Sequence, residues 1–489
     1  MKSHDPSSPA YRKAHKHYLR STFKSEPDTA AWSAFRLQEK RYKSRFPRPT
    51  LDDVLDVASA IDNDHPQSLM KSAGWSCGSC NATPTQSLPL SGNPGGAFIV
   101  PRIPGLVILP GFIRPEEQRT LIMACLRDHA LFPNETNLDI HYNVPPLGIW
   151  SLWEKHWHCQ RTGVDPSIDD TIINLKATAS SSSKNSESAP SRAAPGRPLT
   201  NNPPLSISNF PVILSTPQPP PTPASTLPPL PASQLLYKLR WANIGRSYHW
   251  GTKSYDFSKQ LGAFPEDIRV ICRRAVQAVP WARVWGDIAG DQDWGDEGEN
   301  WRDWHDSYEP DAGIVNFYQE RDTLMGHVDR SELSSTTPLV SVSLGNAAIF
   351  LIGGLTRDVE PLPILLRSGD VVIMSGPSCR RAYHGRCSRC PRKVTSTLMS
   401  KCHPSPNTAG VPRILEGTLP GYLGPHPDVL NCSSQFYDLQ DRRDGDESSG
   451  VDWAPFAEYM KTTRININVR QVFPRGLHEA FRLVILYLL

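Results

Sequence analysis

Two histidines and one aspartate have the types and spacing that a transition-metal site requires. His327 and Asp329 are two positions apart, so both lie on one face if the segment is extended. His384 follows an apolar run and a Gly/Ser turn further along the chain. Two histidines and one carboxylate form the facial triad that leaves positions on Fe(II) open for a co-substrate and oxygen. We predict that these three residues bind iron, with a surface pair without metal as the alternative for the first two and His403 as a competing third ligand.

A second polar pattern lies near the end of the chain, at residues 464–470. If this segment is a strand, Ile465, Ile467 and Val469 share one face, and Arg464, Asn466, Asn468 and Arg470 share the other. The two arginines would lie about 20 Å apart along the strand, yet both side chains are long enough to fold toward one small dicarboxylate. The alternative is a half-exposed edge strand whose polar side chains face water.

The elements that must position these residues are mostly short strands. Strand patterns occupy residues 98–100, 106–109, 312–318, 339–352, 364–366, 370–375 and 464–472, with Gly, Pro, Ser and Asp between them. A helix is predicted from Pro115 to Leu126. Many short strands separated by turns are typical of a β-sandwich or a jelly roll, here in an α+β chain.

Composition indicates that part of the chain is not globular. Of 489 residues, 47 are proline, and only 38% are hydrophobic. Residues 1–96 read as a loosely ordered, basic N-terminal extension, and residues 177–232 as a Pro/Ser-rich, disordered insertion. Residues 286–311 hold ten acidic residues and one arginine, which predicts a solvated surface loop.

Charge and cysteine content bear on partners and compartment. Residues 1–50 carry a net charge of +8, whereas the whole chain carries +3, so the remaining residues are net negative. This basic arm suits nucleic acid or an acidic partner, and the alternative is a solvated tail without a ligand. Ten scattered cysteines and the absence of a signal or spanning segment predict an intracellular protein of the nucleus, cytoplasm or mitochondrion, without a membrane partner. Two Cys-x-x-Cys pairs, at 77–80 and 387–390, are weak candidates for a zinc site.

Several motifs together resemble those of the AlkB-like Fe(II)/2-oxoglutarate dioxygenases, in the same order. They are Asn-Phe-Tyr at 316–318, His-Val-Asp-Arg-Ser-Glu-Leu at 327–333, the Gly-Gly-ending segment 343–354, Ser-Gly-Asp-Val-Val-Ile-Met-Ser-Gly at 368–376, Tyr-His-Gly at 383–385 and Arg-x-Asn-x-x-x-Arg-Gln at 464–471. The motif at 327–333 and the sequence Leu239-Arg240-Trp241 are similar to those of the eukaryotic subgroup typified by the first mammalian AlkB homologue. The resemblance covers residues 97–475, followed by a tail at 476–489.

The resemblance implies a double-stranded β-helix (jelly-roll) core with flanking helices. It also implies that His327, Asp329 and His384 hold Fe(II), and that O2 and 2-oxoglutarate are co-substrates. Arg464 would bind the distal carboxylate of 2-oxoglutarate and Arg470 would lie near its keto-acid end. Asn316, Tyr318 and Asn466 would hydrogen-bond the same molecule. Family members oxidise a methyl group on a base nitrogen, releasing formaldehyde, succinate and CO2.

A methylated base in RNA, such as tRNA, or in DNA must leave its stack to reach a buried iron, so aromatic walls are expected. Trp241, Tyr248, Trp250 and Tyr255 are candidates, with core packing as the alternative, and Arg330 either contacts substrate or forms a salt bridge, for example to Glu332.

Residues 386–410 interrupt the family pattern beside His384, as a lineage-specific loop or a translated intron. A protein oxygenase acting on a histone or another basic protein, and an inactive jelly-roll scaffold, are the alternative functions of this chain, which we expect to be a monomer.

Overall fold

The structure of the 489-residue chain is a computed structural model. It describes residues 9, 11–13, 15–16, 32–44, 48–60, 65–75, 83–90, 93–163, 170–177, 205–206, 209–215, 219, 223–224, 226–257, 259, 262–320, 322, 324, 326–385, 414–425 and 452–474. Most of the predicted Pro/Ser-rich insertion, the insert 386–410, both Cys-x-x-Cys pairs, His403 and the tail 476–489 lie outside these residues.

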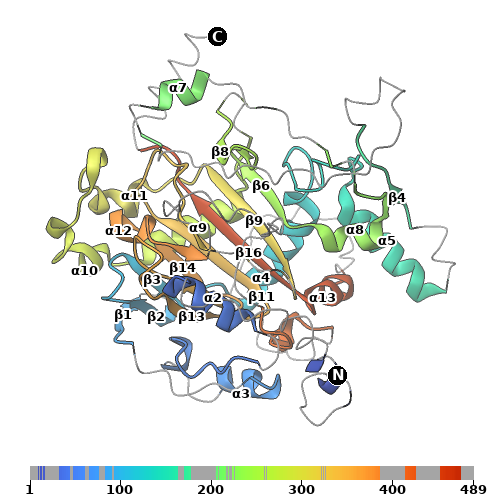
Figure 1. Cartoon of the computed structure of the whole chain (residues 1–489), viewed down its shortest axis with the longest axis horizontal. Coiled ribbons are helices and arrows are strands. Elements are labelled where there is room, and N and C mark those ends of the chain that lie inside the picture. The colour runs from blue at the N-terminus through green and yellow to red at the C-terminus, as the bar shows by residue number, and fades with distance from the viewer. Residues whose placement is uncertain are drawn as a thin grey trace, which may run out of the picture.

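An antiparallel sheet of eight strands forms the centre of the molecule (Figure 1). In spatial order its strands are β1 (Gln86–Leu90), β2 (Asn93–Ile99), β3 (Leu106–Leu109), β14 (Val371–Met374), β11 (Leu339–Gly345), β16 (Thr463–Arg470), β9 (Ala312–Gln319) and β6 (Trp241–Gly245). Strand β16 comes last along the chain but lies between β11 and β9. The predicted strands at 98–100, 106–109, 312–318, 370–375 and 464–472 all correspond to strands of this sheet, within a few residues at their ends.

A smaller antiparallel sheet contains β10 (Gly326–His327), β15 (His384–Gly385), β12 (Ala348–Ile352) and β13 (Leu362–Leu366). The two sheets share an apolar layer in which Ile108 and Val372 of the large sheet pack with Ile352 and Ile364 of the small one. Residues adjacent to Ile108 along β3, such as Val107, belong to the core on the opposite face. This alternation gives the large sheet an inner face toward the small sheet and an outer face toward helices.

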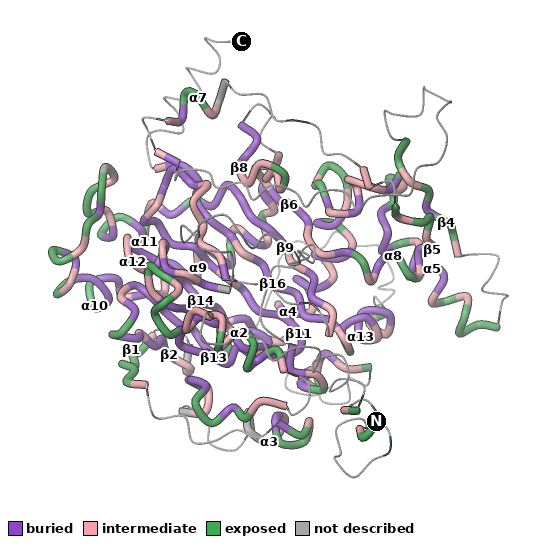
Figure 2. The backbone as a smooth tube through the Cα atoms, in the orientation of Figure 1, coloured by how far each residue is buried: buried purple, intermediate pink, exposed green. Residues whose placement is uncertain are grey.

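Helices cover the outer face of the large sheet. The main ones are α4 (Pro115–Ala124), α5 (Gly148–Thr162), α8 (Ala232–Leu235), α9 (Glu266–Ala278) and α13 (Ala454–Met460). Helix α9 buries Ile268, Ile271, Cys272, Ala275 and Val276, the spacing of one helical stripe. These side chains join the large sheet in one core. Figure 2 shows that the central strands of the sheet are mostly buried. The predicted mixture of helices and a large antiparallel sheet is confirmed, and no described helix has the length and apolarity to cross a membrane.

Part of the N-terminal segment packs on the small sheet instead of forming the loose extension that we predicted. It contains α2 (Ala34–Lys43) and α3 (His65–Ser72). Phe35 and Tyr42 of α2 are fully buried and share a core with Ile349 of β12 and Leu365 of β13. These partners lie more than 300 positions away along the chain, so no local pattern indicates the contact.

The acidic segment 286–311 also differs from the predicted solvated loop. Short helix α10 (Trp281–Trp285) precedes it and α11 (Trp304–Ser307) lies within it. Trp294, Trp301 and Trp304 are buried in the main core. The Glu297 carboxylate accepts hydrogen bonds from the hydroxyls of Ser334, Ser335 and Thr336. The segment is therefore a packed element that is tied to the loop following β10.

Candidate metal and co-substrate site

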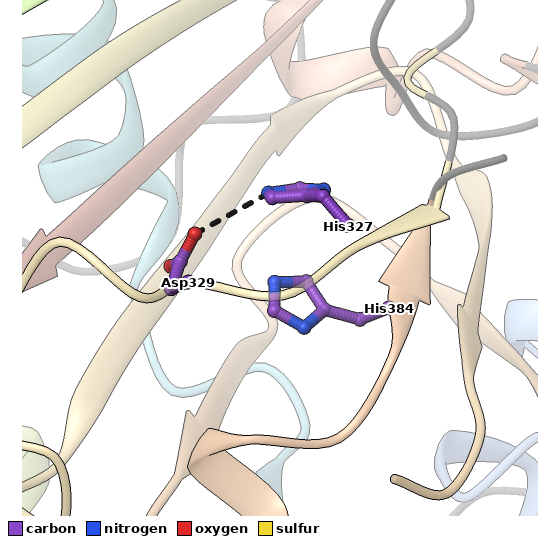
Figure 3. A group of neighbouring side chains, drawn as sticks. All are labelled: His327, Asp329 and His384. Atoms are coloured by element: carbon purple, nitrogen blue, oxygen red, sulfur yellow. Dashed lines mark ion pairs between the residues drawn. The ribbon is translucent and has the colours of Figure 1, made fainter. Parts of the chain in front are cut away.

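The predicted iron ligands lie together between the two sheets. Strands β10 and β15 pair so that His327 and His384 are direct partners, with ring centroids 4.5 Å apart. The His327 Nε2 atom lies 3.5 Å from Asp329 Oδ1, and one donor atom from each of the three residues lies within 4.8 Å of the others (Figure 3). Ligands about 2.1 Å from a metal lie up to about 4.2 Å apart. The three donors are therefore close to coordination distance for a single ion.

The charges around Asp329 keep this carboxyl ionised. Burial alone would raise its pKa, but nearby positive charge, chiefly the Arg470 guanidinium, outweighs burial and holds the pKa below its ordinary value. The backbone carbonyl of Asp329 accepts a hydrogen bond from Arg381, at 2.6 Å. Arg470 thus contacts the carboxylate and Arg381 fixes the backbone of the same residue. A charged carboxylate in a fixed position is a suitable ligand for a divalent cation.

His384 is oriented by its own backbone neighbourhood. Its Nδ1 atom lies 3.0 Å from the Ala382 carbonyl oxygen, which favours the tautomer with the proton on Nδ1 and the lone pair on Nε2. Burial lowers the pKa of His384, so the neutral ring is favoured. Metal-binding histidines commonly make this kind of hydrogen bond through the second ring nitrogen.

The polar face of β16 looks into the same space. Ile465, Ile467 and Val469 belong to the helix-side core, so Arg464, Asn466 and Arg470 occupy the inner face. Arg464 and Arg470 are 1% and 5% exposed. The alternative of a half-exposed edge strand is wrong, because β16 is hydrogen-bonded to β11 on one side and β9 on the other.

Arg464 is a buried cation that forms no ion pair among the described residues, and the charge of Asp370 acts on it only from a distance. Its Nη2 atom donates to Ser343 Oγ at 2.8 Å and its Nη1 atom to the Asn346 carbonyl at 3.2 Å, while Nε has no partner there. Burial lowers the pKa of Arg464 to about 10, which leaves it charged at neutral pH. A desolvated guanidinium needs a compensating anion, so this position fits a bound carboxylate.

Of the other predicted 2-oxoglutarate residues, Asn316 and Tyr318 lie on β9, beside β16, and Asn466 lies on β16 itself. Tyr318 is the ladder partner of Arg464, and its buried hydroxyl has no hydrogen-bond partner among the described residues. Asn316 is the partner of Asn466, but the Asn466 amide already donates to Ser341 Oγ and the Val342 carbonyl. Tyr318 therefore has an unused polar atom beside Arg464, whereas the donors of Asn466 are engaged within the sheet.

Arg470 has a different environment from Arg464. Its Nη2 atom lies 3.3 Å from Asp329 Oδ2, and its Nη1 atom lies 3.3 Å from Glu332 Oε1 and 3.1 Å from the Tyr255 hydroxyl. Arg470 thus links a predicted metal ligand to a buried acid. The sequence suggested Glu332 only as a salt-bridge partner of Arg330, and nothing in the local pattern indicates its pairing with Arg470.

The substrate candidates form an aromatic group next to this network. Strand β7 (Tyr248–His249) pairs with β8 (Ser254–Tyr255). Trp241 stacks on Trp250 at 5.1 Å, Tyr248 meets Trp250 and Tyr255 edge to face, and Tyr255 reaches Arg470. Burial raises the pKa of Tyr248 well above its ordinary value.

Arg330 is half-buried on the loop between Asp329 and Glu332. The predicted alternative of a salt bridge to Glu332 is not formed, since the ion-pair partners of Glu332 are Arg470 and Arg380.

The sequence of this chain is similar to sequences of known proteins. A family model described as the 2OG-Fe(II) oxygenase superfamily matches residues 214–470. The nucleic acid dioxygenase ALKBH1 of Homo sapiens is 33% identical over 238 residues, which span 49% of this chain and about half (47%) of the human protein. The tRNA demethylase abh1 of Schizosaccharomyces pombe is 27% identical over 75% of this chain and 89% of its own. The DNA N(6)-methyladenine demethylase ALKBH1A of Arabidopsis thaliana is 26% identical over 91% of this chain and 98% of its own.

Proposed function

Because this chain belongs to the 2OG-Fe(II) oxygenase superfamily, in which the predicted AlkB-like resemblance also places it, we propose that it is a dioxygenase that demethylates N-methylated bases of RNA or DNA. Family membership gives Fe(II), 2-oxoglutarate and O2 as its cofactor and co-substrates, and a jelly-roll core as its fold. The proposal assigns His327, Asp329 and His384 to the metal.

The observation that carries the proposal is a three-residue ligand set together with the buried guanidinium of Arg464, which forms no ion pair among the described residues. Arg464 lies on the same face of β16 as Arg470, the arginine that contacts Asp329. Fe(II) with O2 and 2-oxoglutarate supplies the oxidation of an N-methyl group, which leaves as formaldehyde. Arg464 and Tyr318 supply the charge and the hydroxyl that bind a carboxylate of 2-oxoglutarate. Arg470 stabilises the ionised form of Asp329 and keeps that side chain directed toward the two histidines.

The substrate class is inferred from the relatives and from the aromatic group. Relatives named as a tRNA demethylase and a DNA N(6)-methyladenine demethylase act on methylated bases in different nucleic acids. Trp241 and Trp250 offer flat apolar surfaces of the kind on which an unstacked base lies. We assign these two rings and Tyr248 to the wall of the base pocket, and Arg330 to a contact with a phosphate or base.

The test is formaldehyde release from N1-methyladenosine RNA and N6-methyladenine DNA, with a methylated histone peptide assayed beside them. Turnover of nucleic acid that is lost in H327A and D329A supports the proposal. Turnover of the peptide alone would favour the protein-oxygenase alternative. Consumption of neither substrate, together with failure to convert 2-oxoglutarate to succinate, would leave the inactive scaffold as the better account of this chain.

A further inference from the structure

Strand β10, which carries His327, is only two residues long and pairs with β15 through Gly326–Gly385 and His327–His384. Gly326 is buried, so its backbone N–H needs a hydrogen-bond acceptor from within the protein. That acceptor comes from a segment 287 positions away: the Gly326 N–H donates to Glu39 Oε1 of helix α2, at 2.7 Å. A buried carboxylate thus completes the hydrogen bonding of the residue next to a predicted metal ligand.

Glu39 is fixed in place by its surroundings. Its side chain is 6% exposed, and its second oxygen lies 3.1 Å from Arg36 Nη1. Arg357 and Lys43 add further positive charge close to the same carboxylate. A buried carboxylate among several cations is costly to move, so its position is well defined.

Helix α2 also contacts Gly353, which is hydrogen-bonded to the residue before the second histidine. Phe35 approaches Gly353 so closely that a Cβ there would lie 3.1 Å from the Phe35 ring. The Gly353 N–H donates to the carbonyl of Tyr383, the residue before His384, at 2.7 Å. The helix itself is anchored by a hydrogen bond from the Phe35 N–H to the Arg357 carbonyl. One N-terminal helix therefore supports the backbone on both sides of the His327–His384 pair.

We propose that Glu39 is a positioning residue for this metal site, and that α2 is part of the catalytic unit and not a separate arm. Through the Gly326 amide, the Glu39 carboxylate sets the place of the His327 ring relative to Asp329 and His384. The inference rests on the proposed function, because it assumes that these three side chains bind a metal.

The test is titration of the full chain with Mn²⁺, a redox-stable probe for the Fe(II) position, in the presence of 2-oxoglutarate. E39L removes the acceptor, E39D withdraws it by one methylene, and E39Q keeps an acceptor oxygen. Q38A is the matched control, since Gln38 lies on the same helix but bonds Glu360 on the surface. The thermal midpoint of each metal-free variant is measured in parallel.

We expect E39L and E39D to bind Mn²⁺ about tenfold more weakly than the natural chain, and E39Q and Q38A to bind it like the natural chain. A purely structural role would lower the thermal midpoint of E39D and leave its Mn²⁺ affinity unchanged, which would overturn the inference. If E39L fails to fold, E39D decides. If the natural chain itself binds no Mn²⁺, the proposed function fails first.

Discussion

Arg464 gives the sharpest test of the co-substrate assignment. Its guanidinium is fully buried, donates to Ser343 Oγ and the Asn346 carbonyl, and forms no ion pair among the described residues. Lysine at this position would keep the positive charge but lose the planar, two-pronged donor. We therefore expect R464K to bind 2-oxoglutarate more weakly and to bind metal as before.

The size of the effect follows from the number of bonds lost. One hydrogen bond to a charged group contributes about 1.5–3 kcal/mol, and 1.4 kcal/mol corresponds to a factor of ten. Loss of one such bond to the 2-oxoglutarate carboxylate should raise the KM for 2-oxoglutarate about 10- to 100-fold. The assay is succinate formation at varied 2-oxoglutarate, with Mn²⁺ titration to show that the metal site is intact.

The matched control is R367K, which alters a half-buried arginine of the same domain. Arg367 already has a bidentate carboxylate partner in Asp56, at 2.5 and 2.6 Å. R367K should lower the unfolding midpoint without changing the KM for 2-oxoglutarate. A folded R464K variant whose KM equals that of the natural chain would refute the assignment of Arg464.

Three further predictions concern the metal ligands and their supports. D329A should abolish stoichiometric Mn²⁺ binding, measured by titration, because it removes the anionic ligand of the set; undiminished binding would contradict the ligand assignment. R470M should lower the free energy of unfolding by about 3–5 kcal/mol, because Asp329 and Glu332 lose a shared buried partner. Denaturant unfolding measures this change, and a change below about 1 kcal/mol would show that other groups compensate the two carboxylate charges. E297A should lower the free energy of unfolding by about 1–3 kcal/mol, because the hydroxyls of Ser334, Ser335 and Thr336 lose their acceptor. The same unfolding experiment measures the change, and an unchanged midpoint would mean that the acidic segment does not support this loop.

The candidate site could be predicted from the sequence wherever a short pattern fixed the direction of a side chain. Strict alternation in residues 464–470 separates the apolar face of β16 from the face with Arg464 and Arg470, and the structure has the same two faces. The spacing of His327 and Asp329 likewise predicts a shared direction. These features depend on neighbouring residues only, so one sequence is enough to infer them.

Contacts between distant segments could not be predicted in the same way. The pairing of Arg470 with Glu332, the acceptor role of Glu39 and the burial of Trp294 each depend on a partner far away along the chain. The composition of residues 1–96 and 286–311 favoured loose or solvated structure, because charge and proline content do not reveal that single aromatic side chains reach a core. Tertiary packing overrode composition in both segments.

The place of β16 in the large sheet has a consequence for synthesis of the protein. Strands β9 and β11 leave the ribosome more than a hundred residues before β16, and each exposes an unpaired edge until β16 arrives between them. The large sheet therefore cannot be completed until translation reaches residue 470. A chaperone that shields those two edges during this interval would raise the yield of native protein without touching the finished enzyme.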